Sequence, residues 1–141
     1  MRLKRLASSL FVAAALLMPT TALAATPVTG RWLTVEKDSV VEIAPCGKSL
    51  CGRIQRILAA QPNGPARDVN NPNPKLRNRP IQGLTILSGF TDVGKNWQGS
   101  IYDPRRGKTY KSFLALQQNG KLQVKGCLGP FCQSQFWTRA R

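Results

Sequence analysis

The chain has 141 residues, with 21 Lys and Arg against 6 Asp and Glu, a formal net charge of +15, four cysteines and no histidine. This length corresponds to one domain. The lack of histidine excludes a Ser/His/Asp triad, a Cys/His pair and imidazole acid–base chemistry. The acidic residues are scattered without a D-x-D or E-x-x-E grouping. We therefore expect no enzyme activity, no metal site and no cofactor.

The N-terminus has the three parts of a secretory signal peptide. Basic residues precede an apolar run over residues 6–18, and Ala22-Leu23-Ala24 follows as a cleavage motif. The apolar run is shorter than the roughly 20 residues that span a bilayer, so we expect no transmembrane segment. The prediction is a signal peptide over residues 1–24, cleavage near Ala24, and export of residues 25–141 as a single domain that is periplasmic or secreted.

From Val28 onward, short β-branched and aromatic runs alternate with Gly, Asn, Asp and Pro, which is typical of an all-β barrel or sandwich. Asp103 opens a Pro- and Gly-containing turn, and Asn119-Gly120 is a strong hairpin signal. Eight strands with short turns favour a closed antiparallel up-and-down barrel. The expected strands cover residues 28–35, 39–44, 50–58, 81–90, 96–102, 108–116, 121–128 and 131–140.

One long loop, residues 59–80, interrupts this pattern and is rich in Pro and Asn. Loops of this length inside a compact domain are usually functional or disordered. Its candidate site residues are Asp68, Asn71, Arg77 and Arg79. In one interpretation the two arginines clamp a carboxylate or phosphate group at the barrel mouth. In the other, Asp68 pairs with one of them and holds the loop in place.

The four cysteines form two close pairs. Cys46 and Cys51 enclose four residues, and so do Cys127 and Cys132. In an exported domain of this size an even number of cysteines indicates disulfides. Each pair flanks a predicted turn, so pairing within each pair is expected, although the sequence also allows the crossed pairings.

Aromatic and basic residues mark the two ends of the predicted barrel. Gly30 and Trp32 open the first strand, and Trp137 and Arg139 close the last. A closed barrel makes these strands neighbours, which would let the Arg139 guanidinium stack on the Trp32 indole. The alternative is a core Trp32 beside a solvated Arg139, and both interpretations stay open here.

Several short motifs follow one another along the chain: Gly30-x-Trp32, Cys46-Gly47-x-x-Leu50-Cys51-Gly52-x-Ile54, Asp68-x-x-Asn71-Pro72-x-Pro74-x-x-Arg77-x-Arg79-Pro80-Ile81-x-Gly83, Trp97-x-Gly99-x-Ile101-Tyr102-Asp103-Pro104, Gly107-Lys108-x-Tyr110 and Trp137-Thr138-Arg139. Together they resemble the secreted bacterial family known as domain of unknown function number 2147, over nearly the whole mature chain. The resemblance implies a calycin-like, lipocalin-resembling β-barrel in the periplasm, with no established activity. Asn73 departs from the acid expected in many relatives, which argues against a carboxylate role for the long loop.

The expected function is non-enzymatic binding of a small apolar or amphipathic ligand inside the barrel, with Trp97, Tyr102 and Tyr110 as further ligand-contact candidates. If bulky inward side chains fill the barrel, the alternative is a solid module that acts on the cell envelope or on a protein partner through its basic surface. Anionic lipid head groups, lipopolysaccharide or acidic cell-wall polymer would then be its partners. Export argues against nucleic acid.

Overall fold

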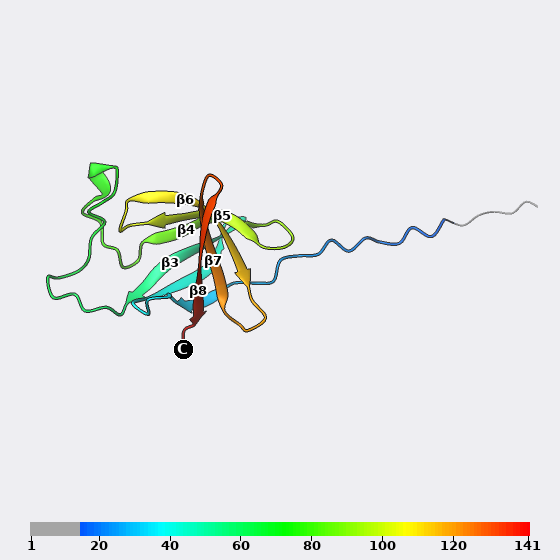
Figure 1. Cartoon of the computed structure of the whole chain (residues 1–141), viewed down its shortest axis with the longest axis horizontal. Coiled ribbons are helices and arrows are strands. Elements are labelled where there is room, and N and C mark those ends of the chain that lie inside the picture. Colours follow the sequence, from blue (N-terminus) through cyan, green and yellow to red (C-terminus); the bar gives the residue numbers. More distant parts are fainter. Residues whose placement is uncertain (1–14) are drawn as a thin grey trace, which may run out of the picture.

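A computed structural model describes residues 15–141 of the chain. The basic start of the expected signal peptide and most of its apolar run lie outside these residues. Residues 15–24 form an extended, exposed segment that leads away from the folded part (Figure 1). Within the described part of the chain, no helix is long and apolar enough to cross a membrane.

Eight antiparallel strands close into a barrel in chain order, which confirms the predicted fold (Figure 1). Each strand pairs with the next, and β1 pairs with β8 through Trp32 opposite Arg139 and Leu33 opposite Thr138. The strands are β1 (Gly30–Leu33), β2 (Ser39–Cys46), β3 (Ser49–Ile57), β4 (Thr85–Asp92), β5 (Trp97–Asp103), β6 (Lys108–Leu116), β7 (Leu122–Leu128) and β8 (Phe131–Arg139).

Two strands are shorter than expected because local turns use their backbone groups. β1 ends at Leu33, since the Thr34 amide donates to the Ser39 carbonyl at 3.1 Å and begins the turn to β2. β4 begins at Thr85 instead of residue 81, because the Leu84 amide donates to the Ile81 carbonyl at 3.0 Å. The long loop therefore extends further along the chain than the sequence pattern indicates.

Alternation along the strands determines which side chains point inward, as β7 shows. Leu122 and Val124 are buried inside the barrel. Phe113, which departs from the alternation of β6, lies on the outer face. The ammonium groups of Lys111 and Lys125 lie 5.3 and 5.2 Å from its ring centroid, so both lysines make cation–π contacts with this ring.

The N-terminal segment, residues 25–29, closes one end of the barrel. Val28 is fully buried, and its carbonyl accepts a hydrogen bond of 2.9 Å from the Trp32 indole. The Trp97 indole donates to the Thr26 carbonyl, also at 2.9 Å. These bonds satisfy the indole N–H groups while the rings pack in the apolar core. The opposite end of the barrel has no such covering segment within residues 15–141, and the cavity described below opens there.

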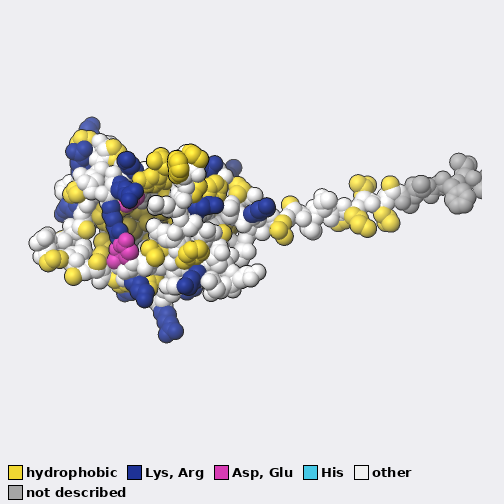
Figure 2. All heavy atoms as spheres, in the orientation of Figure 1, with side chains coloured by type: hydrophobic (Ala, Val, Ile, Leu, Met, Phe, Trp, Pro, Cys, Tyr) yellow, Lys and Arg dark blue, Asp and Glu magenta, His cyan; other side chains and the backbone are white. Residues whose placement is uncertain are grey.

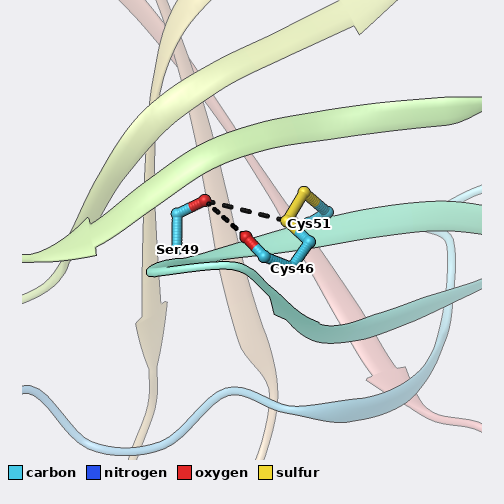
Figure 3. Close-up of a disulfide and its surroundings, with 3 residues drawn as sticks. All are labelled: Cys46, Ser49 and Cys51. Atoms are coloured by element: carbon cyan, nitrogen blue, oxygen red, sulfur yellow. Dashed lines mark hydrogen bonds between the residues drawn. A yellow bond between two sulfur atoms is a disulfide. The ribbon is translucent and has the colours of Figure 1, made fainter.

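Both expected disulfides are present, Cys46 with Cys51 and Cys127 with Cys132. The first braces the β2–β3 turn, where the Ser49 hydroxyl donates to the Cys46 carbonyl at 3.3 Å (Figure 3). The second joins directly opposed residues of β7 and β8. All four cysteines are thus used.

We expect non-reduced peptide mapping of the protein, produced in an oxidising compartment, to find these two linkages and no alkylatable thiol. Because each bridge closes a short loop, reduction should lower the free energy of unfolding by about 2 kcal/mol or less per bridge. Linkage of Cys46 to Cys127 or Cys132 would contradict the pairing.

Candidate ligand cavity

A cavity of about 1270 Å³ begins inside the barrel, opens at the end opposite the N-terminal segment and extends outward between the turns and the long loop. Its middle is lined by aliphatic side chains, among them Ile54, Ile86, Ile101 and Val124, and Trp137 contributes to its wall. Figure 2 looks onto a hollow with hydrophobic side chains inside and acidic and basic side chains beside it. Bulky side chains therefore do not fill the barrel, and the space is large enough for a ligand of drug size.

The paired strands β5 and β6 show how the wall changes from floor to rim. Side chains at alternate positions share one face of a strand, so three register pairs point inward. They are, from the closed end to the mouth, Trp97 with Leu114, Ile101 with Tyr110, and Asp103 with Lys108. The barrel interior is thus apolar at the closed end, carries a tyrosine in the middle and is charged at the mouth, which suits an amphipathic molecule.

Gly126 on β7 keeps the middle of the cavity open. A Cβ atom at this position would lie 3.7 Å from the Ile101 side chain and 3.9 Å from the Tyr110 side chain, which are ordinary contact distances. A Cβ at Gly52 or Gly99 would instead lie within 3 Å of neighbouring atoms. A Cβ atom at Gly126 therefore fits without forcing the barrel wall apart, and a larger side chain there would extend into the cavity.

An ion-pair bridge crosses the mouth of the cavity. Arg105, in the β5–β6 turn, donates to both carboxylate oxygens of Glu36 and, at 2.7 Å, to Asp38 in the β1–β2 turn. These turns lie on opposite sides of the eight-stranded barrel, so the guanidinium spans the opening. The Asn70 side chain donates to the Arg105 carbonyl at 2.8 Å and connects the long loop to the same bridge.

The bridge is charged at neutral pH. The hydrogen bond and the charge of Arg105 lower the pKa of Glu36, and the hydrogen bond to Glu36 raises the pKa of Arg105. Burial by itself would raise the pKa of Asp38, but hydrogen bonds from Thr34 and Ser39 and the charge of Arg105 lower it. A ligand that enters through the mouth must therefore pass the ion pairs between Arg105 and the two carboxylates.

Asp68 anchors the long loop to the outside of β5. Its side chain is completely buried and accepts hydrogen bonds from the Tyr102 hydroxyl at 2.6 Å, the Asn71 amide at 2.8 Å and Arg79 at 2.8 Å. The Arg79 guanidinium also lies 5.8 Å from the Tyr102 ring centroid. The structure thus contains the Asp68–Arg79 ion pair of the loop-holding interpretation.

These contacts explain two opposite pKa shifts. Burial alone would raise the pKa of Asp68, but the hydrogen bonds from Tyr102, Asn71 and Arg79 outweigh it and lower that pKa. Burial and the Asp68 carboxylate raise the pKa of Tyr102, because the neutral phenol donates to that carboxylate. The hydroxyl of Tyr102 is thereby committed to holding the loop.

The predicted site residues divide between the cavity and the loop. Tyr110 lines the cavity from inside the barrel, whereas Tyr102 borders it at the loop side with its hydroxyl bound to Asp68. Trp97 does not, because the register of β5 places it at the closed end. The four loop residues, Asp68, Asn71, Arg77 and Arg79, are also absent from the cavity wall.

The expected arginine clamp at the mouth is not formed. Arg79 binds Asp68, and the Arg77 Nε donates to the Asn71 carbonyl at 2.8 Å. The guanidinium that spans the opening is instead that of Arg105, in the Pro- and Gly-containing turn that begins at Asp103. Its partners Glu36 and Asp38 lie 69 and 67 residues away in the sequence, so no local pattern connects them.

Comparisons with known proteins agree with this geometry. A model of the family described as uncharacterized protein conserved in bacteria, DUF2147, matches residues 30–139. Among solved structures, protein HP1028 from the human pathogen Helicobacter pylori, described as belonging to the lipocalin family, is 30% identical with a TM-score of 0.65, and the match covers 73% of each chain. No curated protein matches the chain.

Proposed function

The chain belongs to the DUF2147 family of uncharacterized bacterial proteins, and from this premise we propose that it is an exported, non-enzymatic binder of a small apolar or amphipathic ligand. The observation that carries the proposal is the 1270 Å³ cavity, apolar inside and charged at its rim. The similarity to a protein described as a lipocalin supports this assignment. Export rests on the signal-peptide pattern of residues 1–24.

The chemistry of the wall determines which ligands fit. Aliphatic and aromatic side chains favour the transfer of an apolar group from water, by about 25 cal/mol for each Å² buried. Tyr110 and the inward amides of Gln133 and Gln135 add a few polar contacts within the apolar surface. A ligand with an extended apolar body and a polar end at the Asp103–Lys108 rim satisfies both parts of the wall.

Filling the cavity tests the proposal directly. The probe is N-phenyl-1-naphthylamine, an uncharged dye whose fluorescence rises in apolar surroundings. We expect saturable binding to the protein and at least about a tenfold loss of affinity in Gly126→Leu, about 1.4 kcal/mol, because the leucine side chain occupies space that the dye needs. Gln123→Leu, on the opposite face of the same strand, is the matched control and should bind like the unchanged protein.

Native mass spectrometry of protein isolated from its own periplasm complements the dye. A co-purifying small molecule that is absent from Gly126→Leu would identify the natural ligand. Equal dye affinity in the unchanged protein and Gly126→Leu would place binding outside the barrel and contradict the proposed function.

A further inference from the structure

The backbone nitrogen of Ala25 lies against the carboxylate of Asp92. It is 3.0 Å from one carboxylate oxygen and 2.9 Å from the other, and Ala25 is buried. The Gly94 amide donates to the first of these oxygens at 2.8 Å, so the β4–β5 turn fixes the carboxylate in position. The carboxylate therefore offers a separate acceptor oxygen to each of two hydrogens on this nitrogen.

In the uncleaved chain Ala25 carries a single amide hydrogen, which must be shared between the two oxygens. Cleavage after Ala24 would convert this nitrogen into an ammonium group with three hydrogens and a positive charge at neutral pH. One hydrogen can then bind each oxygen, and the contact changes from a neutral amide facing a carboxylate to an ion pair. The same atoms would make a better contact after processing than before it.

We propose that the Ala24–Ala25 bond is the processing site and that the new terminal ammonium group pairs with Asp92 to fasten the floor of the barrel. Hydrolysis of this bond by a signal peptidase consumes one water and leaves a carboxylate on Ala24 and the amine on Ala25. The segment that follows carries Thr26 and Val28, whose carbonyls accept from the indoles of Trp97 and Trp32. Processing would thereby stabilise the closed end.

Intact-mass measurement of protein isolated from the periplasm tests the site itself, and a chain that begins at Ala25 is expected. For the contact, the exported chain is compared with one exported through a signal that leaves Leu23 and Ala24 attached, each with and without Asp92→Asn. The processed chain should have a Tm about 2–5 °C higher, as a partly buried ion pair gives in a domain of this size.

Asp92→Asn should lower the Tm of the processed chain by more than that of the extended chain. Asp103→Asn is the matched control, since its carboxylate accepts the Arg105 amide in a similar turn at 3.0 Å but lies at the other end of the barrel. A chain that begins elsewhere, or equal effects of Asp92→Asn on both chains, would overturn the proposal.

A second, independent feature lies at the open end, where the β7–β8 turn exposes apolar side chains. Leu128 is 66% exposed and Phe131 is 80% exposed, and both also line the cavity. The disulfide Cys127–Cys132 holds the base of this turn. Figure 2 shows hydrophobic side chains at the upper edge of the barrel, where β7 and β8 turn in Figure 1.

Two lysines lie close to this turn on the outer face of the sheet, both beside the Phe113 ring. Lys111 pairs in register with Cys127, and Lys125 pairs with Ser134. An exposed apolar tip beside cations is complementary to a bilayer with anionic head groups, because the tip enters the interface while the cations contact the phosphates.

We infer that the β7–β8 tip docks on an anionic phospholipid bilayer and places the rim of the cavity at its surface. The purpose of this docking, ligand exchange with the bilayer, rests on the proposed function. The test is co-sedimentation with vesicles of equal parts POPC and POPG. Replacing Leu128 and Phe131 with Ser should reduce the bound fraction at least about tenfold, since two exposed apolar side chains lose their burial in the interface. Vesicles of POPC alone should bind little.

Val93→Ser is the matched control, because Val93 is 51% exposed in the β4–β5 turn at the closed end. Gly126→Leu should lose the dye and keep vesicle binding, which separates failure of the cavity from failure of the docking surface. Vesicle binding that is insensitive to the tip, or a tip-dependent dimer in sedimentation velocity, would overturn the inference in favour of general basic adsorption or a protein interface.

Discussion

Replacing Trp32 with Ala is expected to lower the free energy of unfolding by about 3–5 kcal/mol, as large-to-small changes of buried aromatic residues do. Trp32 is fully buried at the closed end and donates to the Val28 carbonyl at 2.9 Å. Its removal would leave a cavity and free the segment that closes the barrel. Urea denaturation followed by circular dichroism measures the loss.

The Arg139 side chain stacks on the Trp32 ring. Its guanidinium carbon lies 3.9 Å from the Trp32 ring centroid, and its Nη1 donates to the Thr29 carbonyl at 2.8 Å. Trp32 is thus a core residue and also the stacking partner of Arg139, so the two interpretations of the sequence both hold in part. Arg139→Ala should destabilise less than Trp32→Ala.

A double-mutant cycle of these two residues should show a coupling energy of about 0.5–2 kcal/mol, the range of a desolvated cation–π pair. Strictly additive effects would contradict an energetic role for the stacking, while the burial of Trp32 would be unaffected.

The second large effect is expected at Asp68. Asp68→Ala should lower the free energy of unfolding by about 3 kcal/mol, because breaking a buried ion pair also leaves the Tyr102 hydroxyl without its acceptor and removes one of the two acceptors of the Asn71 amide. The value lies at the lower end of the usual range, since the Arg79 side chain is 35% exposed and water can solvate it. Limited proteolysis should find new cleavage sites between residues 59 and 80.

The two loop arginines provide an internal comparison. Arg79→Gln should reproduce part of the Asp68→Ala effect, because it leaves the buried carboxylate with fewer donors. Arg77→Gln should change stability little, since Arg77 is exposed and its contact is with the Asn71 carbonyl. Equal loss in both variants would contradict the structural assignment of the loop.

Acid should loosen the loop and the mouth together. The pKa values of Asp68, Glu36 and Asp38 are lowered in the folded protein. Their contributions to stability are therefore present above the unfolded pKa of about 4 and are lost as the pH falls through the lower folded values. The free energy of unfolding is expected to fall below about pH 4, and Asp68→Asn should show a smaller fall. An unchanged pH profile in that variant would contradict the role of Asp68.

Strand alternation and turn residues were enough to predict the barrel. A period of two places one face of each strand inside, and short turns between eight strands leave the first and last strands as neighbours. The closeness of Trp32 and Arg139 follows from that closure, and the two disulfides follow from cysteines that flank tight turns. Each of these features depends on short sequence separations or on topology.

Periodicity and turn chemistry, which are local properties of the chain, were thus sufficient to predict the closed barrel and to favour pairing within each close pair of cysteines, and the three-dimensional structure then excludes the crossed pairings. Whether the barrel is hollow could not be read from the chain, since an open interior depends on how side chains from all strands fill a shared volume, with glycine at position 126. Only the tertiary structure decided that Arg79 serves Asp68 and that Arg105 bridges the mouth to Glu36 and Asp38. Such partners are chosen by three-dimensional proximity, and the sequence offers each arginine several carboxylates without ranking them.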